Sequence, residues 1–244
     1  MKKIISTGFT LIFLGILFSG CTSTQTIAQS PEPSHVTYQT FYDDLSPYGT
    51  WIDYPPYGNV WDPNVAGGFR PYFTNGYWNY TNEGNLWMSD YSWGWGPFHY
   101  GRWIYDDFYG WVWVPGYEWS PAWVTWGMMD GFYAWALLMP GVNAGVRFGS
   151  WRPAAFYWNV VRQNDLYHRH IMNVAENRNN ANNYVRNINV IDNFGTTGKN
   201  RQYYSKGPDM DQYRQRTGTT IHPYTIHEAK IAGENRQVGN DVQV

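Results

Sequence analysis

Tryptophan is the residue type whose spacing in this sequence most strongly predicts binding chemistry. The pattern G-x-W, then five or six residues, then G-x-x-W, occurs three times, beginning at Gly49, Gly76 and Gly101. Indole rings on one exposed face of a sheet can stack on sugar rings or hold a cationic or apolar group. The candidate ligand-binding residues are therefore the six tryptophans of the pattern: Trp51, Trp61, Trp78, Trp87, Trp103 and Trp113.

The same rings also have a purely structural interpretation. A buried aromatic side chain removes roughly 150–250 Å² from water, so a domain of short strands can use such rings only to gain burial. Between residues 38 and 158, however, 38 of 121 residues are Phe, Trp or Tyr, which is more than we expect one interior of this size to hold. Two alternatives remain open: the strands are covered on both faces, or they expose one aromatic face to a ligand.

Residue patterns typical of catalysis are sparse. The sequence contains no G-x-S-x-G, H-E-x-x-H or phosphate-binding loop. Asp106 and Asp107 are adjacent in a predicted turn, whereas the carboxylates of a glycosidase face each other across a cleft. His168 and His170 would need at least one further ligand to hold a metal, and His99 is interpreted as a packing residue. We therefore expect no enzymatic activity, no metal and no cofactor.

Each unit of the tryptophan pattern predicts a β-hairpin. Its second glycine ends a turn, where a residue with positive φ closes the hairpin; these are Gly58, Gly84 and Gly110. Alternation along the second strand places a tryptophan on one face and Val60, Leu86 or Val112 on the other. The predicted fold class is all-β: an antiparallel meander of repeated Trp-rich hairpins, forming a small barrel or a sandwich.

One short helix is predicted near the C-terminus, in "KGPDMDQYRQRTG". Pro208 suits a first helical turn, Asp209 and Asp211 complement the positive helix end, and Gly218 ends the helix. Gly and Pro interrupt the aromatic region every 8 to 12 residues, so we expect little helix there.

Composition divides the chain into four predicted segments. These are a signal peptide at 1–20, a lipidated cysteine with a flexible tether at 21–37, a Trp/Tyr-rich repeat domain at 38–158, and a basic Asn-rich extension at 159–244. Residues 38–150 carry 10 acidic and 3 basic side chains, net −7, whereas residues 151–244 carry 8 and 12, net +4. This asymmetry suggests that the extension folds back on the acidic domain.

The N-terminus has the features of a secretion signal. Lys2 and Lys3 precede the apolar run "IISTGFTLIFLGILF", and "SGC" follows, which resembles the lipobox of bacterial lipoproteins. The resemblance implies cleavage before Cys21 and acylation of that residue, with palmitate a typical chain. An ordinary signal with an incidental cysteine is the alternative. Thr22 after the cysteine implies the outer membrane, with the periplasmic face favoured over the cell surface.

Longer motifs carry a second resemblance. The segments "FYDDLSPYGTW", "RPYFTNGYW", "WGWGPFHYGRW" and "GWVWVPGYEWSPAWVTW" are similar to the bacterial envelope family called domain of unknown function 6600. The similarity is close over residues 38–145, although "AWALL" stands where the family has "GWAPL". The resemblance implies a secreted, often lipid-anchored β-rich protein, and it supplies no established activity.

These observations together predict a non-enzymatic lipoprotein of the cell envelope. Its Trp-rich domain is expected to bind or organise an envelope component, either a glycan or another envelope protein. One alternative is a purely structural assembly protein of the outer membrane, and the least favoured is an enzyme acting on envelope glycan. Nucleic acid is disfavoured as a partner because the aromatic domain is acidic and the protein is predicted to be exported.

Overall fold

The computed structural model describes residues 36–142, 144, 153–197, 202–227 and 236–243. The predicted signal peptide and lipidation site, Cys21, lie outside the described residues. Residues 36–244 form one compact unit of antiparallel, hairpin-rich sheets with few helices, and the predicted all-β fold class is confirmed. Among the described helices, none is long and apolar enough to cross a membrane.

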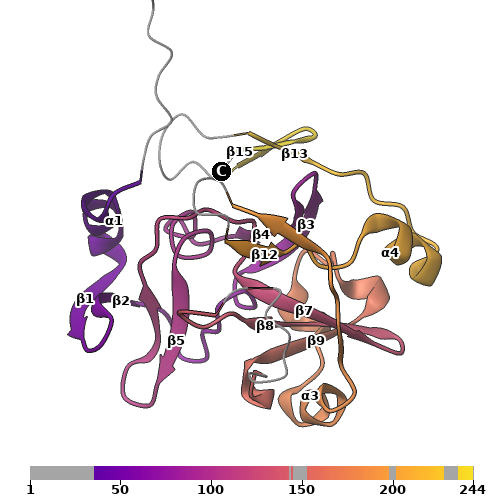
Figure 1. The fold of residues 1–244 in the computed structure, drawn as a ribbon, viewed down its shortest axis with the longest axis horizontal. Helices are drawn as coiled ribbons and strands as arrows, with labels where there is room; N and C mark the ends of the chain where they lie inside the picture. Colours follow the sequence, from indigo (N-terminus) through magenta and orange to yellow (C-terminus); the bar gives the residue numbers. More distant parts are fainter. Residues whose placement is uncertain (1–35, 143, 145–152, 198–201, 228–235, 244) are drawn as a thin grey trace, which may run out of the picture. The chain divides into compact units, whose positions relative to one another are not determined.

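All three predicted hairpins are present, and they lie in the indigo to magenta part of Figure 1. They are β1 (Gly49–Tyr54) with β2 (Gly58–Pro63), β3 (Gly76–Thr81) with β4 (Gly84–Ser89), and β5 (Arg102–Asp106) with β6 (Gly110–Val114). The three predicted turn glycines have φ values of 72°, 104° and 79°, in the region that favours glycine: Gly58, Gly84 and Gly110.

A fourth hairpin follows that the sequence pattern does not reveal. Strands β7 (Val124–Met129) and β8 (Phe132–Leu137) are joined at Gly131, whose φ is 74°. Trp126 and Trp135 lie directly opposite each other in this hairpin, as the paired tryptophans do in the first three. This hairpin does not match the G-x-W pattern, because no glycine stands two residues before Trp126.

The hairpins do not pair in chain order, and the sheets do not close into a barrel. Strand β2 pairs with β6, which gives the order β1-β2-β6-β5, while β3 and β4 form a separate two-stranded sheet. A third sheet has the order β10-β7-β8-β9, with β9 at Trp158–Arg162 and β10 at Asn189–Val190. The meander is thus interrupted, because the edge of β2 that β3 would occupy is taken by β6.

The tryptophans of the first sheet form one row across all four strands. Trp51 is opposite Trp61, Trp61 is opposite Trp113, and Trp113 is opposite Trp103. Directly opposed side chains on one face are close enough to pack, and such cross-strand pairs stabilise a sheet. The recurring tryptophan spacing therefore builds a continuous indole row where the first and third hairpins join.

The first glycine of the pattern has a separate role, which is to make room for an indole. A Cβ built on Gly76 would lie 2.7 Å from Cε2 of Trp87 on the partner strand, and one on Gly49 would lie 2.6 Å from Nε1 of Trp61. These distances are too short for any real side chain. G-x-W is thus one steric unit, in which the glycine of one strand receives the tryptophan ring of the other.

Gly76→Ala is expected to lower the free energy of unfolding by about 2 kcal/mol, because the added methyl overpacks a buried ring. The control is Gly67→Ala, where a Cβ would meet no atom within 4 Å and φ is not in the left-handed region. Urea unfolding of both variants measures the difference. Equal stability of the two variants would contradict the steric role of the motif.

The remaining tryptophans of the hairpins gather into a second group. The ring centroids of Trp78 and Trp87 are 5.1 Å apart, those of Trp78 and Trp126 are 4.6 Å apart, and those of Trp126 and Trp135 are 5.7 Å apart. The group joins the β3-β4 hairpin to the β7-β8 hairpin through side chains, without strand pairing between them. All four rings are fully buried.

The opposite face of these strands is also covered. Val60 and Val112 are completely buried with Ile104 in one cluster, and Leu86 is buried with Met88 and Val242 in another. Of the two alternatives that the sequence left open, the structure thus has strands covered on both faces. Because the buried residues are divided among several clusters on both faces of the sheets, the domain can bury many large rings.

The predicted C-terminal helix is confirmed as α4 (Met210–Thr217). Asp209 caps it by accepting a hydrogen bond from the Gln212 backbone N–H at 2.7 Å, and Gly218 ends it with a φ of 71°. The C-terminal extension, residues 159–244, also contains helices α2 (Ile171–Val174) and α3 (Arg178–Val185).

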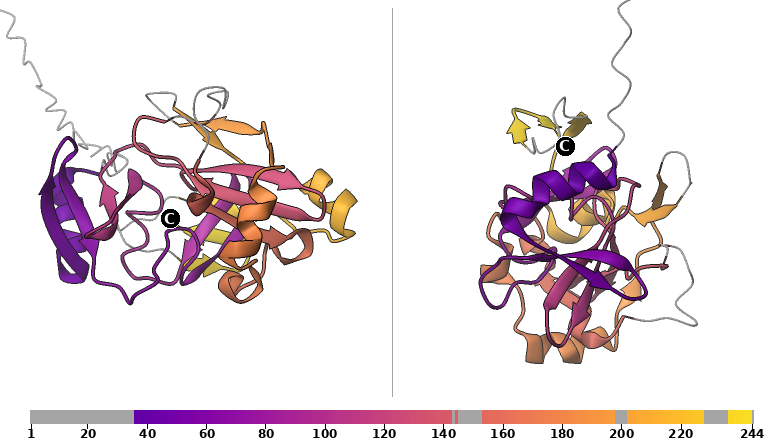
Figure 2. Two further views of the ribbon diagram at one scale, coloured as in Figure 1. Left: turned by 90° about the horizontal axis from the view of Figure 1, so that it is seen from below. Right: turned by 90° about the vertical axis from the view of Figure 1, so that its left-hand side faces the viewer.

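A helix that the sequence analysis missed, α1 (Tyr38–Leu45), lies beside the β1-β2 hairpin in the right-hand view of Figure 2. Its N-cap, Thr37, exchanges hydrogen bonds with Thr40. Phe41 and Leu45, one turn apart, are completely buried, and the Phe41 ring centroid lies 4.9 Å from that of Trp113. The helix therefore packs against the indole row.

The C-terminal extension completes the core instead of forming a separate layer of its own. The boundary expected after Trp158 falls inside β9, and β9 and β10 form the two edges of the β7-β8 sheet. Asn85 of β4 donates hydrogen bonds to the carbonyl oxygens of Lys206 and Pro208 at 2.6 and 3.2 Å. The change in composition after Trp158 thus does not mark a structural boundary.

Short strands of the extension form two further sheets. Strand β11 (Phe194–Thr196) pairs with β12 (Tyr203–Ser205). Strand β15 (Asp241–Gln243) lies between β13 (Thr225–His227) and β14 (Arg236–Val238). The Tyr224 backbone, just before β13, is hydrogen-bonded to Tyr80 and Asn82, so this sheet is also tied to the β3-β4 hairpin.

Candidate ligand-binding cleft

The six tryptophans predicted to bind a ligand do not form an exposed face. The exposed fraction of the side chain is 0 or 1% for five of them: Trp61, Trp78, Trp87, Trp103 and Trp113. The sixth, Trp51, is half-buried, with ring centroids 5.2 Å from Tyr38 and 5.8 Å from Tyr42. The expectation that these rings lie on a ligand-binding surface is wrong, because α1 and the neighbouring hairpins cover the face that carries them.

An aromatic cleft lies next to the indole row, on the same sheet face. Tyr105 of β5 and Trp111 of β6 are directly opposite each other, two residues beyond Trp103 and Trp113, and their ring centroids are 5.3 Å apart. Phe156, from the 3-10 turn Ala155–Tyr157, stacks on Trp111 at 5.9 Å with an interplanar angle of 15°. Three elements therefore contribute to one aromatic wall.

The cleft has a volume of about 350 Å³, and the loop after β2 forms its other side. Tyr109 also lines it, and the exposed fractions of Tyr105 and Tyr109 are 41% and 39%, so these rings are open to a ligand. Ligand pockets of small molecules typically begin at about 300 Å³ and combine apolar walls with few polar groups. The remaining lining residues are Asp62, Pro63, Val65, Ala66, Gly67, Gly68, Phe69, Arg70, Gly110 and Arg178.

Three charged residues line the same cleft: Asp62, Arg70 and Arg178. Burial raises the pKa of Asp62, since a carboxylate loses hydration there. Burial, together with the positive charge of Arg178, lowers the pKa of Arg70 to about 10. Arg70 thus remains charged at neutral pH, in a site where its charge is poorly hydrated.

The third hairpin differs from the other two at the positions that form the cleft. The residue pair next to the tryptophan pair is Asp53 with Asn59 in the first hairpin and Tyr80 with Asn85 in the second, but Tyr105 with Trp111 in the third. The sequence signal was therefore available: only "GRWIYDDFYGWVW" has aromatic residues at all four positions of this face. No local pattern points to Phe156 or Arg178.

The acidic pair lies outside the cleft, in the turn where it was predicted. Asp106 Oδ1 accepts hydrogen bonds from the backbone N–H groups of Phe108 and Tyr109 at 2.8 and 2.9 Å, and Oδ2 accepts one from the Tyr54 hydroxyl at 2.7 Å. These bonds, with that of Tyr109 first, hold the pKa of Asp106 below its usual value. Asp106 therefore organises the turn and links two hairpin tips.

The histidines form no metal centre among the described residues. His168 and His170 are exposed, and the described part of the chain contains no group of three or more His, Cys, Asp or Glu side chains that could hold a metal ion. His99 is completely buried, and its Nδ1 lies 3.1 Å from the Ser120 carbonyl oxygen. This is the packing role that the sequence suggested for it.

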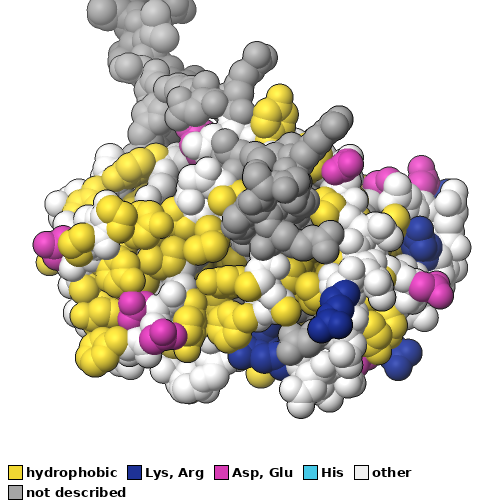
Figure 3. Space-filling view, turned by 60° about the horizontal axis from the view of Figure 1, so that its bottom comes forward, with side chains coloured by type: hydrophobic (Ala, Val, Ile, Leu, Met, Phe, Trp, Pro, Cys, Tyr) yellow, Lys and Arg dark blue, Asp and Glu magenta, His cyan; other side chains and the backbone are white. Residues whose placement is uncertain are grey.

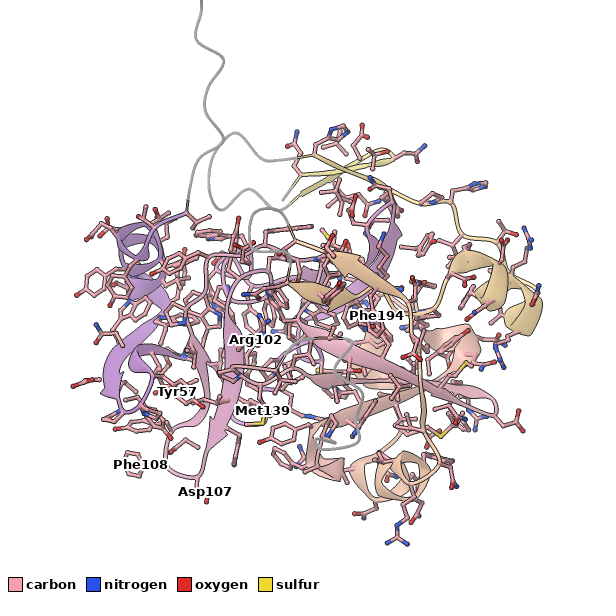
Figure 4. The ribbon with its side chains drawn as sticks, viewed as in Figure 1. Tyr57, Arg102, Asp107, Phe108, Met139 and Phe194 are labelled. Carbon is pink, nitrogen blue, oxygen red and sulfur yellow. The ribbon has the colours of Figure 1, made fainter. Side chains whose placement is uncertain are left out.

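Aromatic side chains also project at the hairpin tips. Phe108 and Asp107 lie at the outer end of the β5-β6 hairpin in Figure 4, and Phe108 is 86% exposed. Figure 3 shows a broad area of hydrophobic side chains on one face of the molecule, with a few acidic groups among them and Lys and Arg near its lower edge. The surface thus retains exposed aromatic residues even though the pattern tryptophans are buried.

The fold and the cleft define a β-hairpin repeat protein with an aromatic, charge-lined cleft. Residues 42–142 match the model of a family of unknown function, DUF6600, so the resemblance found in the sequence is confirmed over this segment. The matched segment contains all four tryptophan hairpins, whereas Phe156 and Arg178 of the cleft lie beyond it. No curated protein and no solved structure matches the chain.

Proposed function

We propose that this protein is a non-enzymatic lipoprotein of the bacterial cell envelope that binds an envelope glycan through the aromatic cleft. In this proposal, acylated Cys21 anchors the chain to the outer membrane, with the folded unit on the periplasmic face. The lipobox-like "SGC" supports the anchor, since several acyl chains hold a protein stably where one would not. The site is the cleft beside the indole row.

One observation carries the proposal: aromatic rings from three elements converge on a cleft next to charged side chains. Tyr105 and Tyr109 are about two-fifths exposed, so an incoming ring can reach them. Aromatic faces carry negative potential, which attracts the C–H groups on one side of a sugar ring. Asp62, Arg70 and Arg178 are placed to hydrogen-bond hydroxyl groups at its rim.

Binding without hydrolysis fits the carboxylates of this cleft. A glycosidase uses two carboxyl groups that flank the bond to be cleaved. Asp62 is the one carboxylate among the described residues that line the cleft. We therefore favour a binding protein over an enzyme that acts on glycan.

Tyr105→Ala is expected to weaken glycan binding about tenfold, because it removes an exposed ring from the cleft while leaving the core intact. Isothermal titration calorimetry with peptidoglycan fragments and envelope polysaccharides measures the affinity. The matched control is Tyr203→Ala, which removes a tyrosine that is 53% exposed on β12, away from the cleft. Failure of the unmodified protein to bind any of these glycans would contradict the proposal.

An assembly protein of the outer membrane is the second candidate function. Its support is the exposed aromatic group at the hairpin tips, where Tyr57 is 41% and Phe108 is 86% exposed. Large exposed apolar patches commonly mark interaction sites. The two candidates differ in that this one requires self-association or a protein partner, and sedimentation velocity at increasing concentration distinguishes a monomer from an assembly.

A further inference from the structure

We propose that the ligand of the cleft carries a carboxylate, as an acidic sugar does, and that Arg70 and Arg178 bind this group. The inference rests on the proposed function, because it names the ligand class of the same site. Two guanidinium groups and one carboxylate line the cleft. Residues 38–150 as a whole carry 10 acidic and only 3 basic side chains, of which Arg70 is the one that lines the cleft, and the basic extension supplies Arg178.

Arg70 is held in place with part of its guanidinium still unpaired. Its Nη2 donates to the Trp158 carbonyl oxygen at 3.3 Å and to Oδ1 of Asn159, and the group lies 4.4 Å from the Phe73 ring centroid. Among the described residues, no carboxylate forms an ion pair with Arg70, and its Nη1 and Nε have no hydrogen-bond partner. A charge that is largely buried normally has a partner of opposite sign, so a ligand anion would complete this site.

Arg178 brings a second cation from a distant part of the chain. It is the first residue of α3, and its guanidinium lies 4.3 Å from the ring centroid of Phe156 in the cleft wall. The start of a helix favours negative charge, so helix stability does not explain a cation at this position. Within the described structure, Arg178 has no ion-pair partner. Both its charge and the helix end add positive potential to the cleft.

The two guanidinium groups oppose each other electrostatically until an anion binds. The charge of Arg178 contributes to the lowered pKa of Arg70, which means that each group disfavours the charge of the other. A carboxylate placed between them removes this repulsion. Guanidinium groups also match the planar geometry of a carboxylate and bind it through paired N–H donors.

Asp62 offsets part of the stronger attraction that two guanidinium groups exert on a phosphate, and so shifts the preference of the cleft toward a carboxylate. It lines the same cleft, and its own charge repels any ligand anion. The repulsion is larger for a phosphate monoester, which carries nearly two charges at neutral pH, than for a carboxylate with one. The sugar ring would meanwhile lie against Tyr105 and Trp111, which leaves Asp62 to accept a hydrogen bond from a ring hydroxyl.

The test compares the affinity of the protein for an acidic sugar with its affinity for the uncharged ester of the same sugar. Calorimetric titration of the intact protein uses trigalacturonic acid and its methyl ester, in which methyl groups replace the negative charges of the carboxyl groups and the sugar rings are unchanged. We expect the acid to bind about tenfold more tightly than the ester. N-acetylmuramic acid and glucose 6-phosphate are titrated in parallel, to separate a cell-wall sugar from a uronic acid and a carboxylate from a phosphate.

Variants assign the effect to the two arginines. Arg178→Gln is expected to reduce the tenfold preference for the acid to about threefold while leaving ester binding unchanged, and Arg70→Gln should act in the same direction. Arg178 is exposed, so its variant tests the inference even if loss of the Asn159 contact unfolds the Arg70 variant. Arg162→Gln is the control, because Arg162 is likewise exposed and its guanidinium lies 5.6 Å from the ring centroid of Phe132, outside the cleft.

The outcomes separate this inference from the proposed function. Equal affinity for acid and ester would overturn the carboxylate inference and leave glycan binding in place. Tight binding of glucose 6-phosphate alone would overturn it in favour of a phosphorylated sugar. Failure of every sugar, including the neutral glycans, would overturn the proposed function itself.

Discussion

Trp87→Ala is expected to lower the free energy of unfolding by about 4 kcal/mol, because truncation of a buried indole leaves a large cavity. Trp87 is completely buried, and its ring centroid lies 5.1 Å from Trp78 and 6.2 Å from both Tyr72 and Phe98. Domains are typically stable by only 5–15 kcal/mol, so the variant would be close to unfolding. Urea unfolding followed by circular dichroism measures the change.

The control for this variant is an aromatic truncation at the surface. Phe108 is 86% exposed at a hairpin tip, and Phe108→Ala should change stability by less than about 0.5 kcal/mol. If Trp87→Ala were as stable as Phe108→Ala, the indole would be dispensable for folding and a ligand-binding role for it would have to be reconsidered. A large loss of stability would instead support a core role for the pattern tryptophans.

Stability is expected to fall by about 2.5 kcal/mol between pH 7.5 and pH 4.5 because of His99 alone. Burial lowers the pKa of His99 to about 4, against about 6.5 in the unfolded chain, although hydrogen bonds to Ser120 and Pro121 partly oppose this. At pH values between these two pKa values, the imidazole of His99 binds a proton in the unfolded chain but not in the folded chain. Stability is therefore complete above pH 6.5 and is progressively lost as the pH falls toward 4.

Comparison with His99→Gln isolates this contribution, because glutamine can still donate a hydrogen bond to the Ser120 carbonyl oxygen but does not titrate. Unfolding free energies at both pH values give a slope for each protein, so any constant loss of stability in the variant cancels. We expect the unfolding free energy of the variant to fall by about 2.5 kcal/mol less than that of the unmodified protein between the two pH values, which gives a smaller slope. Identical slopes would show that His99 does not remain neutral in the folded state.

The hairpins could be predicted from the sequence because each is a local structure. Within about a dozen residues, "GYWNYTNEGNLW" contains its own turn glycine, its alternating strands and its opposed tryptophans. The pairing of hairpins could not be predicted in this way. Strand β2 joins β6 at Trp61 and Trp113, and nothing in either strand distinguishes this partner from β3.

The position of the proposed ligand site could not be predicted for a related reason. The sequence pattern predicts that the regularly spaced tryptophans bind a ligand. In the structure, these are the tryptophans that the fold requires for its core. The cleft depends on irregular features: a pair of aromatic residues in one hairpin only, a 3-10 turn, and an arginine from the extension. Phe156 and Arg178 become neighbours of Tyr105 and Trp111 only through tertiary structure.

The fourfold indole group has a consequence for the light that this protein absorbs and emits. Trp78, Trp87, Trp126 and Trp135 have neighbouring ring centroids only 4.6 to 5.7 Å apart, close enough for their electronic transitions to couple and for excitation to pass from ring to ring. The emission of these four rings is then a collective property and not the sum of four independent residues. The four rings therefore report on the contact between two hairpins, and Trp111 in the proposed ligand cleft is not one of them.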